Sequence, residues 1–255
     1  MKIAIIGAGA FGTALGGVLS DKGFEISYYD SKLINASLSD VLDGAMLSIL
    51  AVPSDVVPHL LPYLPKTLPL LVATKGLFDD KLLIDFDKYD VISGPGFASD
   101  IKAQKKTKMT VTSSNIAKMF TTDYLTFDIT SDKKGVLMCG SLKNIYAIFA
   151  GFLGLERDSK DWQDFINDVL VEMKSILVLN GASSDTVDLA CGIDDLMLTC
   201  GLPSRNYEFG MKLAKNRNYK PTNTVEGLTA LNKIRHGIIK IPEDAVIMCK
   251  CLKKL

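Results

Sequence analysis

The amino-terminal segment holds the first residues whose spacing predicts chemistry. Gly7, Gly9 and Gly12 form a G-x-G-x-x-G turn that directly follows an apolar run and opens a predicted helix. In this setting the glycines let the backbone turn tightly and let a pyrophosphate approach it, while free N–H groups at the helix start favour negative charge. The turn therefore predicts dinucleotide binding, and a glycine turn that binds no ligand is the alternative.

Asp30 indicates which dinucleotide would be bound. It ends the second predicted strand, where a carboxylate accepts hydrogen bonds from both ribose hydroxyls of NAD. A carboxylate also repels the 2′-phosphate of NADP, so Asp30 favours NAD. Lys32 leaves NADP as an alternative, because its flexible ammonium could reach that phosphate.

Lys143 is a candidate proton donor, because it lies inside the apolar stretch Val136–Leu155. An ammonium among apolar residues is costly unless it faces a polar site. Reduction of a ketone by hydride needs an acid that protonates the developing oxyanion, and a desolvated lysine beside a second cation such as Lys75 would release its proton more readily. Asp195 could hold the lysine in place. A lysine that packs its stem and extends its charge to solvent is the structural alternative.

Ser204, Arg205 and Asn206 bring a hydroxyl, a guanidinium and an amide together at the start of a predicted helix. A helix N-terminus favours anions and arginine binds phosphate through two hydrogen bonds, so this cluster predicts a phosphate site. A plain serine cap beside a surface arginine would give the same pattern. His59 and His236, the only histidines, lie in a proline-rich segment and late in a basic helix, so neither is expected to be the acid.

The composition favours a small-molecule partner. A chain of 255 residues, 47% of them hydrophobic, can fill the cores of one large or two ordinary domains. The 29 basic and 29 acidic residues balance, so no global charge attracts nucleic acid or a membrane surface. The stretch Ile145–Leu155 is much shorter than the roughly 20 residues of a membrane span, and no signal-peptide pattern follows Met1. We expect a cytoplasmic protein without a membrane span.

The cysteines predict neither disulfides nor a metal site. There are five, without C-x-x-C spacing, at positions Cys139, Cys191, Cys200, Cys249 and Cys251. The C-x-C pair near the C-terminus has only two histidines in the whole chain to complete a ligand set. Reduced thiols and no metal are therefore expected.

Two periodicities divide the chain. Over the first 131 residues, apolar runs alternate with helix-like segments, which is typical of a parallel sheet covered on both faces. The predicted strands are Lys2–Ile6, Glu25–Tyr29, Ala45–Val52, Leu70–Ala73, Asp90–Ser93, Lys108–Thr112 and Leu125–Thr130, with helices over Gly12–Lys22 and, short or irregular, Val56–Leu64. Beyond them, helical spacing predicts helices around Lys133–Gly151, Asp161–Leu179, Asn206–Asn216, Glu226–His236 and Pro242–Leu252. We predict an α/β fold, with an N-terminal Rossmann-type, doubly wound, mostly parallel sheet over 1–131 and an all-helical substrate-binding and catalytic domain over 132–255.

Short motifs along nearly the whole chain support a more specific interpretation. In chain order they are Gly7–Leu15, Ala73–Leu77, Ser93–Ala98, Leu142–Asn144, Gly192–Cys200, Ser204–Asn206 and Val225–Gly227. Together they resemble the signatures of NAD(P)-dependent sn-glycerol-3-phosphate dehydrogenases. The resemblance implies reversible reduction of dihydroxyacetone phosphate to sn-glycerol 3-phosphate, which supplies glycerophospholipid synthesis.

The resemblance also implies site residues. Lys143 becomes the general acid/base, with Asp195 and Lys75 as its catalytic partners. The implied cofactor contacts are Gly7, Gly9, Ala10, Phe11, Gly12, Asp30, Lys75, Ala98, Arg205 and Glu226. The implied substrate contacts are Lys75, Gly94, Gly96, Lys143, Asp195, Ser204, Arg205 and Asn206. The loop that holds Gly94 and Gly96 is expected beneath the nicotinamide, with a simple turn as the alternative.

The sequence departs from the family in ways that keep other functions open. It is shorter, chiefly between Asp30 and Ala45 and in the helical part, and Gly96 stands where the family has Ser or Thr. Asp194 replaces a glycine, so Asp195 is the motif's acid. The alternatives are a ketopantoate or 3-hydroxyacid reductase of the same two-domain build, and a non-catalytic dinucleotide-binding sensor. The trimmed helical part leaves both a homodimer and a smaller monomer open.

Overall fold

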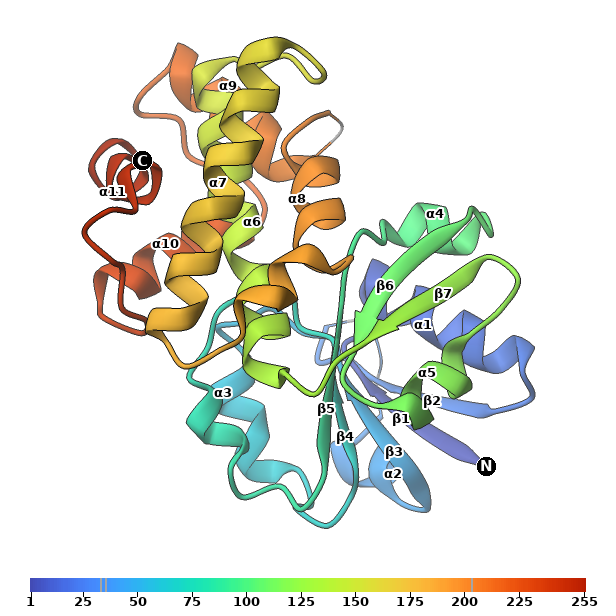
Figure 1. Cartoon of the computed structure of the whole chain (residues 1–255). Helices are drawn as coiled ribbons and strands as arrows, with labels where there is room; N and C mark the ends of the chain where they lie inside the picture. Colours follow the sequence, from blue (N-terminus) through green and yellow to red (C-terminus); the bar gives the residue numbers. More distant parts are fainter. Residues whose placement is uncertain (33, 35, 203) are drawn as a thin grey trace. The chain divides into compact units, whose positions relative to one another are not determined.

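The chain folds into two compact units. The computed structural model describes residues 1–32, 34, 36–202 and 204–255. Unit 1 comprises residues 1–75 and 79–133, and unit 2 comprises residues 76–78 and 134–255. Unit 1 holds a sheet with helices, whereas the regular structure of unit 2 is helical (Figure 1). The predicted fold class is confirmed.

The sheet of unit 1 is mostly parallel. Its strands among the described residues are β1 (Lys2–Ile6), β2 (Glu25–Tyr29), β3 (Ala45–Leu50), β4 (Leu70–Val72), β5 (Tyr89–Ser93), β6 (Thr107–Val111) and β7 (Leu125–Ile129). They lie in the order β2-β1-β3-β4-β5-β6-β7, and only the β5–β6 pair is antiparallel. Every predicted strand is present, with ends within two residues of the prediction.

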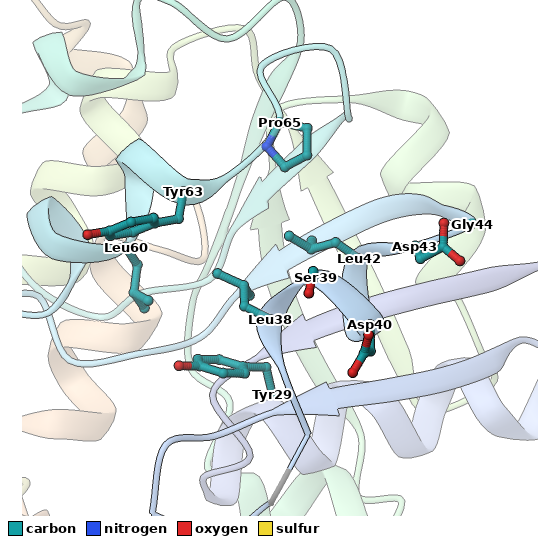
Figure 2. A pocket seen from close by; sticks show the side chains of 10 residues that line it. All are labelled: Tyr29, Leu38, Ser39, Asp40, Leu42, Asp43, Gly44, Leu60, Tyr63 and Pro65. Atoms are coloured by element: carbon teal, nitrogen blue, oxygen red, sulfur yellow. The ribbon is translucent and has the colours of Figure 1, made fainter.

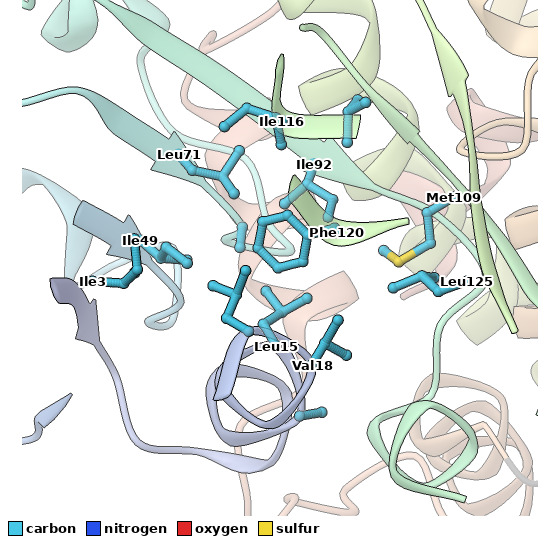
Figure 3. Packing of buried hydrophobic residues seen from close by; sticks show 14 of the residues in the cluster. Ile3, Leu15, Val18, Ile49, Leu71, Ile92, Met109, Ile116, Phe120 and Leu125 are labelled. Atoms are coloured by element: carbon cyan, nitrogen blue, oxygen red, sulfur yellow. The ribbon is translucent and has the colours of Figure 1, made fainter. Parts of the chain in front are cut away.

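One face of the sheet packs against three helices. These are α1 (Ala10–Asp21), α4 (Ala98–Lys102) and α5 (Ser114–Phe120). Side chains from the strands, such as Ile3 and Ile49, meet Leu15 of α1 and Phe120 of α5 in one apolar cluster (Figure 3). Because strand side chains alternate between faces, every second residue of these buried strands contributes to this core. The core fixes the β1–α1 turn, where the predicted dinucleotide contacts lie.

The other face carries short helices and a hollow. Here α2 (Leu38–Leu42) and α3 (Val57–Leu60), which continues into a 3-10 turn over Leu61–Tyr63, border a cavity of about 980 Å³ (Figure 2). Tyr28 of β2 approaches Gly16 of α1, whereas the next residue, Tyr29, lines this cavity. The prolines of the Val56–Leu64 segment shorten α3, as the sequence predicts.

Unit 2 is built around a long apolar helix. Its described helices are α6 (Lys133–Leu153), α7 (Lys160–Leu179), α8 (Ile193–Thr199), α9 (Arg205–Lys215), α10 (Glu226–Arg235) and α11 (Val246–Lys254), with 3-10 turns over Ser184–Asp188 here and Asp80–Leu83 in unit 1. By length and composition α6 could cross a membrane, but 83% of its apolar window is buried within the structure. We therefore interpret α6 as the core helix of this unit.

The C-terminal helix α11 begins at Val246, four residues after the predicted start at Pro242. A distant side chain caps this start. The buried carboxylate of Glu172, on α7, accepts hydrogen bonds from the backbone N–H groups of Ile247 and Met248 and from the hydroxyl of Tyr146. Burial raises the pKa of Glu172, and the hydrogen bonds oppose that shift. A carboxylate at this end also suits the helix dipole.

Alkaline pH should destabilise unit 2. Burial holds the pKa of Tyr146 well above its usual value of about 10, and the pKa values of the Cys200 and Cys251 thiols are also raised by burial. The unfolded chain releases these protons first, so stability present below pH 9 is lost as pH rises, by up to about 1.4 kcal/mol per pH unit for each group. Thermal unfolding is followed between pH 8 and 11. Above pH 10, the Tm of Tyr146→Phe should fall less steeply with pH than the Tm of the wild type. Equal slopes would contradict this assignment.

Candidate active site

The glycine-rich turn has the geometry that the sequence predicts. Gly7 has a φ of +107°, and a Cβ there would lie 2.5 Å from the carbonyl oxygen of Ala51. A Cβ on Gly12 would lie 2.0 Å from the carbonyl oxygen of Gly7. The N–H of Gly7 donates to the carbonyl of Tyr29 at 2.8 Å, which ties the turn to β2. Larger residues at these two positions would displace the turn.

The start of α1 is open to a ligand. Gly9 is the N-cap, no side chain caps the helix, and a Cβ built on Gly9 would meet nothing within 4 Å. The first N–H groups of a helix lack partners inside the helix and attract anions. Ala10 and Phe11 form the first turn beside this space. These residues fit the pyrophosphate of a dinucleotide.

Asp30 is held against the glycine turn. One carboxylate oxygen accepts the Ala8 N–H at 3.1 Å, and the other accepts the Lys32 N–H at 3.0 Å. The carboxylate is thus fixed in orientation at the end of β2.

Lys75, Phe11 and Gly96 come together in unit 1. The Lys75 ammonium donates to the Gly96 carbonyl at 3.0 Å and lies 4.2 Å from the centre of the Phe11 ring. A Cβ on Gly96 would lie 3.1 Å from Cδ1 of Ile101 and 3.2 Å from Sδ of Met109. The packing therefore leaves little room for the Ser or Thr of the family pattern. Gly94 opens the same turn with a φ of +143°, and Ala98 begins α4.

In unit 2, Lys143 and Asp195 form a buried ion pair. Lys143 is 4% exposed on α6, Asp195 is 1% exposed on α8, and the ammonium contacts Oδ1 of the carboxylate. Thr199, one turn further along α8, donates its hydroxyl to the same oxygen at 3.4 Å. Oδ2 of Asp195 is buried and has no hydrogen-bond partner among the described residues. Such an atom indicates a missing donor, which a ligand hydroxyl could provide.

The thiol beside this pair is not a nucleophile. Cys200 is fully buried, and burial raises the pKa of its thiol far above the usual range, although the Lys143 charge opposes the shift. A thiol that stays protonated is chemically inert. The chemistry of this cluster therefore belongs to the ammonium and the carboxylate.

An amide chain connects three helices next to Lys143. Asn206 donates to the side-chain oxygen of Asn144 at 2.8 Å and accepts the N–H of Gly227 at 3.1 Å. Asn144 in turn donates to the carbonyl of Gly140 at 3.1 Å. Asn206 thus links α9 to α6 and to the start of α10, where Glu226 is the first residue. Its amide therefore positions these three helices relative to one another.

Ser204 and Arg205 occupy different environments. Ser204 is buried, and its hydroxyl caps α9 by accepting the Tyr207 N–H at 3.5 Å. Arg205 is exposed at the first residue of α9 and borders a hollow of about 110 Å³ with Glu208 and Lys212. The serine has the capping role that the sequence left open, whereas the guanidinium is accessible to an anion.

Sequence reasoning missed two polar residues at this site. Asn144 and Thr199 contact Asn206 and Asp195 through the fold. Asn144 directly follows Lys143, and Thr199 lies four residues after Asp195 at helical spacing, so each had a local signal.

Comparisons with known proteins identify the family. Residues 132–249 match the protein family described as NAD-dependent glycerol-3-phosphate dehydrogenase C-terminus. The NAD(P)+ glycerol-3-phosphate dehydrogenase of Citrifermentans bemidjiense is 30% identical over 301 aligned positions, which cover 98% of this chain and 88% of that protein. That of Campylobacter jejuni is 30% identical, covering 93% and 85%.

A solved structure shows the same architecture. The crystal structure of glycerol-3-phosphate dehydrogenase from Coxiella burnetii superimposes with a TM-score of 0.80 at 26% identity, covering 98% of this chain and 94% of that one. The alignment with the Citrifermentans protein is longer than this chain, so the present chain is a shortened relative. It belongs to the NAD(P)-dependent glycerol-3-phosphate dehydrogenase family.

Proposed function

We propose that the protein reversibly reduces dihydroxyacetone phosphate to sn-glycerol 3-phosphate, with NADH as the favoured cofactor, and so supplies glycerophospholipid synthesis in the cytoplasm. The buried Lys143–Asp195 pair carries this proposal, because a paired ammonium with an unsatisfied carboxylate oxygen beside it suits a hydroxyl-bearing ketone. Residues 1–131 would bind the dinucleotide, and residues 132–255 would hold the substrate.

Lys143 is the proton donor in this mechanism. A bound NADH, held by the glycine turn and Asp30, would provide the hydride for reduction of the ketone. The Lys143 ammonium gives its proton to the carbonyl oxygen as negative charge develops there, and solvent later returns a proton to the amine. Asp195 orients the ammonium through Oδ1 and accepts a substrate hydroxyl at Oδ2. In the reverse direction Lys143 acts as the base.

The substrate phosphate would be held by Arg205 at the start of α9. Its guanidinium can make two charge-assisted hydrogen bonds, and Asn206 provides an amide next to it. Lys75 and the backbone at Gly94 and Gly96 supply the contacts of unit 1 to substrate and nicotinamide in this proposal. Glu226, at the start of α10, and Ala98 complete the proposed cofactor contacts.

Initial rates with competing substrates test the proposed function. Oxidation of NADH and of NADPH is followed with dihydroxyacetone phosphate, with ketopantoate and with a small 3-oxo acid. Turnover of the phosphorylated ketone alone supports the proposal. Preference for either keto acid would favour a reductase of the alternative class, and tight NADH binding without turnover of any ketone would favour a sensor.

Replacing Asp30 with alanine should narrow the preference for NADH over NADPH. The ribose hydroxyls lose an acceptor and the 2′-phosphate loses a repulsive charge, so NADH affinity should fall by about tenfold, or about 1.4 kcal/mol, while NADPH affinity stays or rises. Titration calorimetry with both cofactors measures this change.

Asp21→Ala is the matched control, because Asp21 is an exposed carboxylate at the other end of α1. It should leave both affinities unchanged. Wild-type protein that binds NADPH as tightly as NADH would show that Lys32, or another cation, dominates the choice.

A further inference from the structure

Trp162, the only tryptophan in the chain, contacts the helix that carries Asp195. It lies in the first turn of α7 and is 2% exposed. Its indole N–H donates to the backbone carbonyl of Cys200 at 2.7 Å. Its own backbone N–H donates to the cap residue Ser159 at 3.2 Å, so the start of α7 holds the tryptophan in place.

The carbonyl of Cys200 lies at the end of α8. Carbonyl groups in the last turn of a helix lack partners inside the helix, and burial makes an unpaired one costly. Trp162 supplies the donor. The other end of α8 is closely packed, because a Cβ on its N-cap Gly192 would lie 2.1 Å from the carbonyl oxygen of Val187. The short helix with Asp195 and Thr199 is therefore held at both ends.

The hydrogen bond from Trp162 to Cys200 also holds the turn that leads to Arg205. After Cys200, the Ser204 N–H donates to the Gly201 carbonyl at 3.1 Å, which closes a turn, and α9 then begins at Arg205. Arg157, just before α7, packs beside Gly201, with its Cδ 3.3 Å from the position of a Cβ there. The residues at and just before the start of α7 thus support the turn between Asp195 on α8 and Arg205 on α9.

We propose that Trp162 is a positioning residue for the reaction, acting through the α8–α9 turn. Its indole N–H sets the spacing between Asp195, which orients the proton donor, and Arg205, which binds the phosphate. Catalysis depends on such spacing, since misplacement by about 1 Å can cost 10²-fold in rate. This role rests on the proposed function, because it assumes that one substrate spans both groups.

Trp162→Phe tests this role, because phenylalanine keeps an apolar ring and removes the N–H. We expect kcat/KM for dihydroxyacetone phosphate to fall by about tenfold or more, mainly through a raised KM for this substrate, with the Kd for NADH unchanged. Tyr146→Phe is the matched control, because it also removes one buried aromatic donor, the hydroxyl bonded to Glu172, without touching the α8–α9 turn. The control should lose comparable stability and keep kcat/KM within about twofold.

Fluorescence gives a second readout that needs no variant at Trp162. Because the chain has one tryptophan, tryptophan emission reports on the surroundings of this side chain. Saturating sn-glycerol 3-phosphate should change the emission of the wild-type protein, and the change should be absent in Arg205→Ala. This measurement tests the proposed role of Trp162 even if Trp162→Phe fails to fold.

The outcomes separate the two proposals. An active wild type in which Trp162→Phe and Tyr146→Phe have the same kinetics overturns the role of Trp162 and leaves the proposed function standing. A wild-type emission spectrum that does not change with sn-glycerol 3-phosphate also overturns the role of Trp162 and leaves the proposed function standing. A wild type that turns over no dihydroxyacetone phosphate overturns both.

Discussion

Replacing Lys143 with methionine should lower kcat for dihydroxyacetone phosphate reduction by about 10²–10⁴, the usual share of a positioned general acid. Methionine keeps an apolar stem and cannot donate a proton. NADH binding should persist, because the proposed dinucleotide contacts of the glycine turn lie in unit 1. A Lys143→Met protein with nearly normal kcat would transfer the assignment to Lys75.

Stability measurements separate a catalytic lysine from a structural one. Asp195 is 1% exposed, so the methionine variant leaves a buried carboxylate without its partner, at a cost of about 3–5 kcal/mol. The double variant Lys143→Met/Asp195→Asn removes that charge and should recover much of the lost stability. Its kcat should stay as low as that of Lys143→Met. Recovery of kcat together with stability would show that the lysine acts only through the fold.

Replacing Arg205 with alanine should raise the KM for dihydroxyacetone phosphate by about 10- to 150-fold, the equivalent of the roughly 1.5–3 kcal/mol of a charge-assisted hydrogen bond. Folding should be little affected, because Arg205 is exposed. Lysine at this position should restore the KM only in part, since it lacks the two-pronged geometry of arginine. Steady-state kinetics at saturating NADH measure the change.

Lys215→Ala is the control for this charge change. Lys215 is an exposed cation at the other end of α9, so its removal alters the net charge equally. The KM of this control should stay within about twofold of wild type, as expected for a screened surface charge. An unchanged KM in Arg205→Ala would place the phosphate elsewhere.

The sheet was predictable because its signals are local. Buried strands such as Lys2–Ile6 are short runs of branched apolar residues, and glycines follow them where the chain must turn. The glycine turn was also predictable, since close backbone approach at Gly7 and Gly12 admits no side chain. Strands and turns that depend only on neighbouring residues can therefore be predicted from the sequence.

Features that depend on distant contacts were not predictable. The carboxylate that caps the start of α11 belongs to Glu172, which lies more than seventy residues away along the chain. The seven-residue helix α8 is too short to show a clear period, so it was not predicted from the sequence. The partners of Asn144 and Thr199 likewise exist only once α6, α8 and α9 have packed.

The most direct test of the central claim compares two ketones that differ only in the phosphate. Initial rates of NADH oxidation are measured with dihydroxyacetone phosphate and with dihydroxyacetone. A site in which Arg205 holds the phosphate while Lys143 protonates the oxygen predicts turnover of the phosphorylated ketone, with kcat/KM at least about 10²-fold higher than for dihydroxyacetone. No oxidation of NADH or NADPH with dihydroxyacetone phosphate, or equal kcat/KM for the two ketones, would contradict it.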